Sequence, residues 1–159
     1  LELLPQPFEK ADSGGAHGNQ DVLLPEDQWL LPITLSPIGH VVNDFQDTES
    51  IPGQYKKTLS KIILDPAYTD GLYRLDEEKR IVIIAYLHKG SGYSLIEKRS
   101  GRNNETYGVF ACRSPYRPNG LAQSIVELVS IEKNVITVRG LDLINGTPVL
   151  DIKTDLSGR

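Results

Sequence analysis

Apolar and polar residues follow one another in short runs along most of this chain, with turn residues between the runs. From Ile33 onward no 3.6-residue period persists, and the runs predict strands rather than helices. Residues 80–88 are almost continuously apolar, which predicts a strand buried on both faces. The other predicted strands span 33–42, 58–64, 93–98, 107–112, 124–131, 135–139 and 149–153, and one helical turn is predicted over 68–75.

Local signals refine this pattern. Pro37 predicts a kink or an edge in the first strand, because proline cannot donate a ladder hydrogen bond. Lys133-Asn134 predicts a tight hairpin link and Asn145-Gly146 a turn. Within 124–131 the residues alternate between two faces. One face has Ile125, Glu127, Val129 and Ile131, and the other has Val126, Leu128 and Ser130.

These elements predict an all-β fold of about seven strands with short helical turns, either a single antiparallel β-barrel or a sandwich. A closed barrel leaves no strand edge exposed, which favours it for a domain of this size. Residues 1–31 differ, because proline and glycine interrupt them and no period persists. We therefore expect an irregular extension over 1–31, with its apolar end docked on the body, and one barrel domain over 32–159.

Composition narrows the class of protein. The chain has 159 residues, of which 39% are hydrophobic and 24% charged, so one globular domain with a core is expected. It has no run of about 20 apolar residues, which argues against a transmembrane helix. Cys112 is the only cysteine, so an intramolecular disulfide and a multi-cysteine zinc site are excluded. With no signal peptide visible, a cytoplasmic location is expected.

Charge is distributed unevenly, although the net charge is only -4. Residues 1–50 carry one base and nine acids, a net charge of -8, whereas residues 51–159 carry 16 bases and 12 acids, a net charge of +4. The densest basic stretch, 97–119, contains Lys98, Arg99, Arg102, Arg113 and Arg117 interleaved with Tyr107, Phe110 and Tyr116. Bases and aromatic rings together are typical of sites for phosphate-bearing ligands with stackable bases. A solvated loop with ordinary surface arginines is the alternative interpretation.

Several chemistries have no motif in this chain. It lacks HExxH, a Cys/His cluster, a Walker loop, a GxGxxG after a strand and a GxSxG elbow, so no metal site is predicted. Arg113 beside Cys112 could activate the thiol, but a cysteine is also often a small buried residue. In 113–120 two prolines stiffen a loop with two arginines, which can bind a carboxylate or a phosphate. Asp142 and Asp151 bracket a turn; a turn cap and an ion pair of Asp151 with Lys153 or Arg117 are the structural alternatives.

Two long motifs, VFACRSPYRPN at 109–119 and GTPVLDIK at 146–153, resemble the TsaA-like family of tRNA N6-threonylcarbamoyladenosine methyltransferases. Ile38-Gly39, Pro52-Gly53-Gln54, Asp70-Gly71-Leu72 and a strand ending in His88 add to the resemblance, which covers about residues 33–154. It implies a single β-barrel that binds S-adenosylmethionine without a Rossmann fold. It further implies a homodimer without metal, and methyl transfer to N6 of the modified adenosine at position 37 of tRNA.

The resemblance also implies which residues contact the ligands. The expected cofactor residues are Pro52, Gly53, Gln54, His88, Lys89, Arg113, Gln123, Arg139, Gly140, Leu141 and Asp142. Motif positions expected on the substrate side are Arg117, Asn119, Asp151 and Lys153. A poor nucleophile such as N6 must lose its proton, and Asp142, His88 or the substrate itself could accept it.

This chain departs from the family pattern at three places. Gly53 stands where the family usually has arginine, and 120–123 replaces the common Pro-Ile-Gly-Leu with a sequence ending in Gln123. The chain also ends at Arg159, without the C-terminal domain of longer bacterial members. Two alternatives to the methyltransferase therefore stay open: a catalytically weakened adaptor that binds S-adenosylmethionine or RNA, and a plain β-barrel interaction module.

Overall fold

The computed structural model describes residues 32–98 and 105–157. The chain divides into two units, Leu1–Leu35 and Ser36–Arg159, and all strands described below belong to the second. The predictions for the extension over 1–31, including the docking of its apolar end, lie outside the described residues, as do Arg99 and Arg102.

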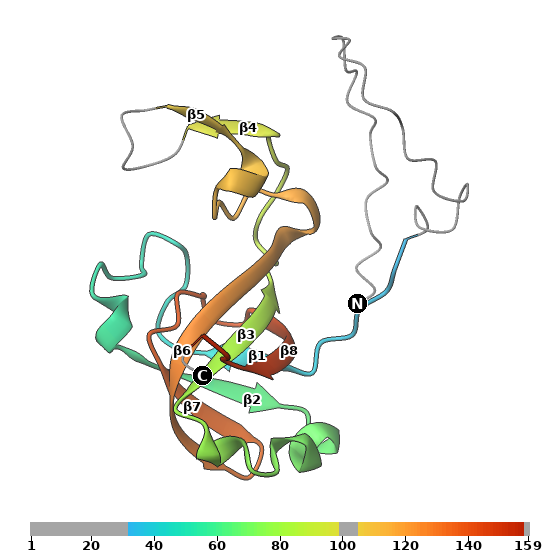
Figure 1. Ribbon diagram of the computed structural model, residues 1–159, viewed down its shortest axis with the longest axis vertical. Coiled ribbons are helices and arrows are strands. Elements are labelled where there is room, and N and C mark those ends of the chain that lie inside the picture. The colour runs from blue at the N-terminus through green and yellow to red at the C-terminus, as the bar shows by residue number, and fades with distance from the viewer. Residues whose placement is uncertain (1–31, 99–104, 158–159) are drawn as a thin grey trace. The chain divides into compact units, whose positions relative to one another are not determined.

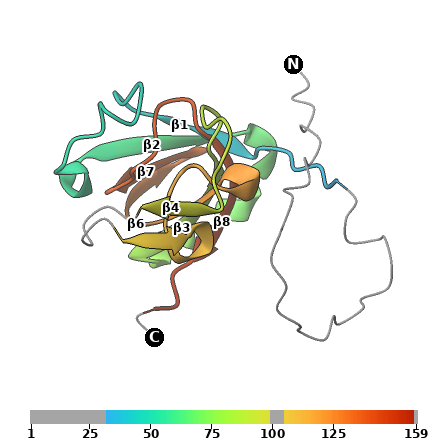
Figure 2. The same ribbon diagram turned by 90° about the horizontal axis from the view of Figure 1, so that it is seen from above.

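Six antiparallel strands close a barrel in the order β1-β2-β7-β6-β3-β8, and β4 and β5 form a separate two-stranded sheet (Figures 1 and 2). The prediction of an all-β barrel is confirmed; the described residues contain eight strands, six of them in the barrel. The strands are β1 (Gly39–Val42), β2 (Leu59–Leu64), β3 (Arg80–Tyr86), β4 (Ile96–Lys98), β5 (Thr106–Gly108), β6 (Leu121–Glu132), β7 (Val135–Arg139) and β8 (Pro148–Thr154). Short 3-10 helices in the connections are η1 (Tyr55–Lys57), η2 (Pro66–Leu72), η3 (Leu75–Glu77), η4 (Val109–Ala111) and η5 (Pro118–Gly120).

Strand β3 lies between β6 and β8 in the barrel. Ile81, Ile83 and Ala85 are fully buried on its inner face, and Val82 on the outer face is only 8% exposed. The predicted burial therefore holds for the inner face, whereas the outer face is buried only at Val82, since Arg80 and Tyr86 are exposed. The strand ends at Tyr86 rather than at residue 88, because the next residues form a turn closed by the Gly90 N–H donating to the Leu87 carbonyl (3.0 Å).

Strand β6 changes partner along its length. Its first half pairs with β3 and its second half with β7, and the register shifts between Leu128 and Ser130. Such a bulge inserts one residue into the ladder and reverses the alternation beyond it. The predicted faces are therefore correct through Val129 and wrong for the two residues after it, because Ile131 packs against the core while Ser130 is exposed.

Strand β1 is shorter than predicted, because residues 32–38 form no ladder. It begins at Gly39, directly after the Ile38 N–H that donates to the Val149 carbonyl (2.8 Å). Gly39 pairs with both β2 and β8, where the backbones approach closely. A Cβ on Gly39 would lie 2.9 Å from the Leu64 Cα and still closer to the Ile63 carbonyl oxygen. The close pairing of β1 with β2 therefore requires glycine at this position.

The predicted helical turn over 68–75 is two 3-10 helices, η2 and η3. Pro66 follows Asp65, whose carboxylate accepts a hydrogen bond from the Ala67 N–H (2.9 Å) and starts η2 early. Arg74, with a φ of 63°, separates η2 from η3. The left-handed backbone at Arg74 ends η2 and precedes η3, so the single helical turn predicted over 68–75 is wrong in its bounds.

Residues 87–120, called the excursion below, connect β3 to its neighbour β6. The Leu87 N–H donates to the Gly120 carbonyl (2.8 Å) and extends the ladder of these two strands. Figure 1 shows β4 and β5 beyond the ends of β3 and β6. The strands predicted over 93–98 and 107–112 are shorter than expected, because residues 93–95 lie outside β4 and η4 follows β5 directly.

Both predicted turns are confirmed. Lys133, with a φ of 55°, and Asn134 link β6 to β7, and Gly146 has a φ of 78° between β7 and β8. The barrel interior is filled by branched aliphatic side chains. Those that are fully buried include Val41, Ile62, Ile81, Ile83, Val126, Ile136, Val138 and Val149. Among the described residues, no helix is long and apolar enough to cross a bilayer.

Candidate functional site

Three connections meet at the same end of the barrel, because successive barrel strands are antiparallel. They are residues 43–58 between β1 and β2, the excursion between β3 and β6, and residues 140–147 between β7 and β8. We call this the loop-rich end. All the cofactor residues predicted from sequence belong to these connections or to the strand ends that lead into them. The fold therefore brings together positions that are far apart along the chain.

Hydrogen bonds tie the β1–β2 connection to the β7–β8 connection. The Asn43 side-chain amide donates to the Leu143 carbonyl (2.9 Å), and the Asn145 N–H donates to the Phe45 carbonyl (2.6 Å). Gly140 donates its N–H to the Thr58 carbonyl (3.1 Å). Two of the predicted cofactor segments, 52–54 and 139–142, are thereby held on one side of the barrel.

Gly140 requires the conformation of glycine, although a Cβ there would make only an ordinary van der Waals contact. Its φ is +87°, and a Cβ there would lie 3.5 Å from the Lys56 carbonyl oxygen. Lys56 belongs to η1, which begins directly after Gln54. Gly53, by contrast, has no atom within 4 Å of its Cβ position, so the turn that it forms is open to solvent.

Asp142 is exposed, but one of its oxygens already has a partner. The buried hydroxyl of Ser124 donates to its Oδ1 at 2.5 Å. Ser124 lies in the first half of β6, which has β3 on one side and is not paired with β7 on the other. The bond bridges this gap in the wall and leaves the second oxygen, Oδ2, for a ligand.

Sequence reasoning missed Ser124. Its place in the alternation of β6 puts it on the inner face with Val126, and a hydroxyl among core positions signals a buried polar partner.

Arg113 reaches the same half of β6. Its Nη2 donates to the Gln123 backbone carbonyl, while the Gln123 side chain is exposed. No ion pair engages Arg113 within the described residues, so its charge and its remaining N–H donors are available. Arg113, Gln123 and, through Ser124, Asp142 are thus placed around one strand end.

His88 and Lys89 lie in the turn that follows β3. The Lys89 ammonium donates to the Gln46 carbonyl (2.8 Å), which links this turn to the β1–β2 connection. The His88 Nδ1 is buried and has no hydrogen-bond partner. Burial, and secondarily the charge of Lys89, lowers the pKa of His88 below 6.5. A neutral imidazole with an orphaned nitrogen results, which is suited to a ligand N–H or to a proton.

Other predicted site residues have structural partners. Arg139 donates to both carboxylate oxygens of Glu127 (3.1 Å each), and the Leu141 side chain is fully buried in the core, so only its backbone can face a ligand. Lys153 pairs with Asp151 at 2.6 Å on β8, the structural alternative considered above. These contacts engage the side chains within the fold, but exposed ion pairs are weak, so the ligand roles expected for these residues stay predictions.

The two remaining substrate-side positions are part of the loop before β6. Arg117 donates to the Cys112 carbonyl (3.1 Å), which closes the loop on itself. Asn119 is exposed and has a φ of 66° in the middle of η5, so its conformation serves the turn that leads into β6. Cys112 itself is buried, in agreement with its interpretation as a small core residue.

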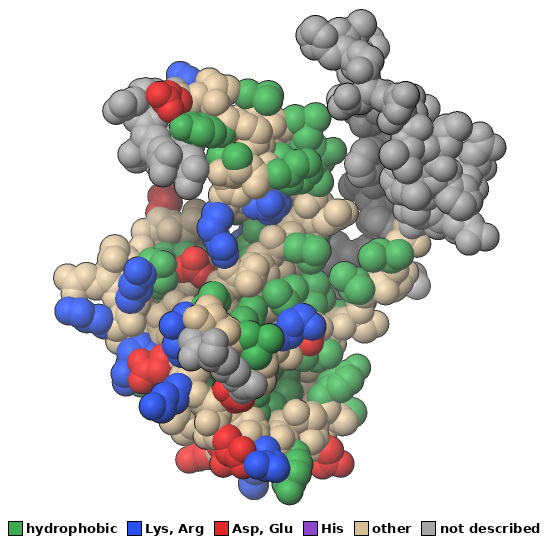
Figure 3. Space-filling view, in the orientation of Figure 1, with side chains coloured by type: hydrophobic (Ala, Val, Ile, Leu, Met, Phe, Trp, Pro, Cys, Tyr) green, Lys and Arg blue, Asp and Glu red, His purple; other side chains and the backbone are tan. Residues whose placement is uncertain are grey.

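Charge is concentrated in the excursion. Residues 87–120 contain six bases and two acids, a net charge of +4, which equals the net charge of the whole 51–159 region. Figure 3 shows Lys and Arg side chains on this face just below the part that holds β4 and β5. The loop-rich end is therefore the electropositive end of this region.

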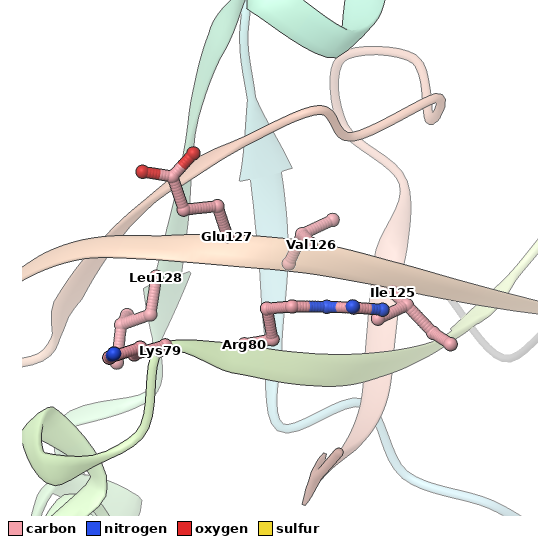
Figure 4. A pocket seen from close by; sticks show the side chains of 6 residues that line it. All are labelled: Lys79, Arg80, Ile125, Val126, Glu127 and Leu128. Atoms are coloured by element: carbon pink, nitrogen blue, oxygen red, sulfur yellow. The ribbon is translucent and has the colours of Figure 1, made fainter. Parts of the chain in front are cut away.

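Two surface hollows in the described structure lie away from the loop-rich end. One is lined by Thr69, Asp70 and Tyr73 of the η2 region, and the other by residues of β3, β6 and the approach to β3. In the second, Figure 4 shows the Arg80 side chain extended toward Ile125 while Glu127 points away. Neither hollow includes a predicted site residue. The described residues also contain no cluster of His, Cys, Asp and Glu that could hold a metal ion.

Comparison with known proteins gives the family. Residues 40–157 match the family described as the tRNA-methyltransferase O N-terminal domain. An S-adenosyl-L-methionine-binding protein of Archaeoglobus fulgidus is 36% identical over 121 residues, which cover 75% of this chain and 86% of that protein. The crystal structure of TrmO from Pseudomonas aeruginosa matches with a TM-score of 0.66 and 31% identity, covering 80% of this chain and 57% of that one. The chain thus spans less than two thirds of that solved structure. This chain belongs to the tRNA-methyltransferase O N-terminal domain family.

Proposed function

We propose that this protein binds S-adenosylmethionine at the loop-rich end and transfers its methyl group to N6 of threonylcarbamoyladenosine at position 37 of tRNA. The observation that carries the proposal is the convergence of Arg113, Asp142 and His88 at one barrel end in a chain of this family. The names of a relative and of a solved structure, an S-adenosyl-L-methionine-binding protein and TrmO, support it.

The side chains present fit this cofactor. Bound there, S-adenosylmethionine supplies a methyl group on a positively charged sulfur, a good leaving group. The free N–H donors of Arg113 complement a carboxylate, and the unoccupied Oδ2 of Asp142 complements an ammonium or a ribose hydroxyl. The orphaned Nδ1 of His88 provides a further acceptor at the same end.

We assign the proton acceptor to His88 rather than to Asp142. N6 of an adenosine is a weak nucleophile, so its proton must be taken up during or after methyl transfer. The His88 imidazole is neutral at pH 7 and its Nδ1 has no partner, whereas Asp142 already accepts a hydrogen bond from Ser124.

This assignment predicts a pH dependence. Because burial lowers the pKa of His88 from its ordinary value, the neutral imidazole predominates at neutral pH and is lost only in acid solution. The rate of methyl transfer should therefore be independent of pH on the alkaline side of neutrality and fall on the acid side. Single-turnover rates of the wild type and of His88→Gln, measured from pH 5 to pH 8, check it. The variant should be slow and lack this acid limb; an unchanged limb in the variant would assign the titration to another group.

The function itself is tested by two measurements on the same protein. Calorimetry measures the affinity for S-adenosylmethionine, and an assay with radiolabelled cofactor measures methylation of tRNA that carries threonylcarbamoyladenosine. Binding with turnover supports the proposal. Binding without turnover supports the weakened adaptor instead, and a failure of both the cofactor and its demethylated product to bind leaves the plain interaction module.

Gly53 offers a gain-of-function test of the cofactor loop. The Cβ position of Gly53 contacts nothing and its φ is not positive, so an arginine fits there without strain. The arginine that the family usually has at this position should then add a charge-assisted contact between the loop and the cofactor. Gly53→Arg is expected to raise the affinity for S-adenosylmethionine about threefold to tenfold, which is less than a full charge-assisted hydrogen bond because this turn is open to solvent. Calorimetry measures it, with Gly71→Arg as the control at the other end of the barrel; an equal effect of both variants would show non-specific attraction.

Assembly and location follow as parts of the same proposal. We expect a homodimer, as the resemblance implies, and the exposed apolar side chains of Tyr86, Leu121 and Ile125 on the outer faces of β3 and β6 favour an interface there. With a tRNA substrate, we expect a cytoplasmic location. Sedimentation of the purified chain measures its mass directly.

A further inference from the structure

Two aromatic rings of the excursion project into solvent although both lie in stiff backbone. Phe110 is 77% exposed and Tyr116 is 53% exposed. Tyr107, the third aromatic residue of the basic stretch, is half-buried and its hydroxyl donates to Glu105 (2.7 Å). Phe110 and Tyr116 therefore present ring faces that the fold does not use.

The backbone holds Phe110 in this exposed position. It is the middle residue of η4, between Val109, which is 1% exposed, and the buried Cys112 that follows the helix. The Val109 N–H donates to the Leu95 carbonyl (2.9 Å), and the Cys112 N–H donates to the Val109 carbonyl (3.1 Å). Because its neighbours are anchored, the ring points outward without disorder of the chain.

Tyr116 is held in a similar way. Pro115 and Pro118 restrict the backbone around it, and its N–H donates to the Ser114 hydroxyl (3.1 Å). The bond from Arg117 to the Cys112 carbonyl closes residues 112–117 into a loop, so Tyr116 and η4 lie at neighbouring ends of one closed segment. Rings fixed in this way lose little conformational entropy when a ligand stacks on them.

We propose that Phe110 and Tyr116 form a stacking surface for unpaired RNA bases beside the nucleotide that is methylated. The inference rests on the proposed function, and it adds a contact that is separate from the cofactor site. Unpaired bases offer free π-faces, which aromatic side chains bind independently of base identity.

The charges around the rings favour RNA over a protein partner. Arg113 and Arg117 flank Tyr116 in sequence, and neither forms an ion pair within the described part of the chain. The acids of this segment are already engaged: Glu97 accepts from the Ser114 hydroxyl (3.1 Å) and Glu105 from the Tyr107 hydroxyl. Rings beside unpaired cations match a ligand that carries bases and phosphates together.

The test uses the full chain with an anticodon stem-loop RNA that carries threonylcarbamoyladenosine at position 37. Phe110→Ala and Tyr116→Ala should each weaken RNA binding about fivefold or more. Their affinity for S-adenosylmethionine and their sedimentation mass should equal those of the wild type. Tyr73→Ala is the matched control, because Tyr73 is 84% exposed on η2's C-terminal side and should not affect RNA binding.

Stacking has its own spectroscopic signature. In a Trp29→Phe background, Phe110→Trp should retain RNA affinity, and its fluorescence should be quenched when RNA binds. Wild-type RNA affinity in both alanine variants would overturn the proposal. A loss of RNA affinity together with a halved sedimentation mass would also overturn it, because the rings would then bind a second copy of the chain.

Failure of the inference differs from failure of the proposed function. If the wild type methylates this RNA and the alanine variants bind it normally, only the stacking surface is wrong. If the wild type shows no methylation but RNA quenches the tryptophan and the alanine variants lose binding, the stacking surface stands and the proposed activity does not.

Discussion

Replacing Gly39 with alanine should lower the free energy of unfolding by about 3 kcal/mol, at the upper end of what overpacking costs. The added Cβ would fall 2.9 Å from the Leu64 Cα and closer still to the Ile63 carbonyl oxygen. Both are backbone atoms of the paired strand β2, so no side chain can rotate away to make room. Urea denaturation followed by far-ultraviolet circular dichroism measures the change.

Gly71 provides the control for this experiment. It lies in η2, is exposed, and has no atom within 4 Å of its Cβ position. Gly71→Ala should leave the stability within about 1 kcal/mol of the wild type, or raise it slightly, because alanine restricts the unfolded chain. Equal losses in the two variants would show that crowding between β1 and β2 is not the cause.

The second large effect is expected at Arg113. Arg113→Ala should weaken S-adenosylmethionine binding by tenfold to about a hundredfold, since a hydrogen bond to a charged group contributes about 1.5–3 kcal/mol. The guanidinium binds the Gln123 carbonyl with one nitrogen and keeps the others for the ligand. Calorimetry with the cofactor and with its demethylated product checks the value, and unchanged affinity would remove Arg113 from the site.

Two further variants separate charge, geometry and folding at this position. Arg113→Lys keeps the charge but loses the planar fork, so it should recover only part of the affinity. Arg74→Gln removes an exposed arginine whose partner, Glu77, lies at the opposite end of the barrel, and should bind as the wild type does. Thermal unfolding of each variant shows whether the loss of the Gln123 contact alone destabilises β6.

The strands that the sequence predicts best are those whose pattern is set locally. The predicted strand 135–139 matches β7 at both ends, and the predicted strand 58–64 matches β2 within one residue. Each has a clear alternation of apolar and polar residues and is bordered by a turn. The reversal in β6 at Ser130 could not be predicted, since a bulge depends on how the strand pairs with β7 rather than on its own residues.

In the candidate site, too, some features can be predicted from local sequence and others depend on the fold. Motifs alone place Arg113, Asp142 and His88 among the cofactor residues, and all three meet at the loop-rich end. Two other features of the site depend on the tertiary structure. The hydrogen bond between Ser124 and Asp142 joins β6 to the β7–β8 connection, and the nitrogen of His88 lacks a partner because the fold buries it. The sequence already suggests the pair of Lys153 with Asp151, whereas only the fold reveals Glu127 as the partner of Arg139.

The excursion has a consequence for how such a barrel can diversify. Leu87 and Gly120 are bonded across the β3–β6 ladder, so the barrel closes at the base of the excursion whatever lies beyond it. The entropy of closing a loop grows only with the logarithm of its length, so lengthening or exchanging β4, β5 and η4 changes the folding of the barrel little. The part of the excursion that we propose for RNA binding and the residues that we propose for methyl transfer can then evolve at different rates. We expect that a new excursion grafted onto such a barrel, with Arg113 and His88 kept at its two bases, directs the proposed activity to another RNA.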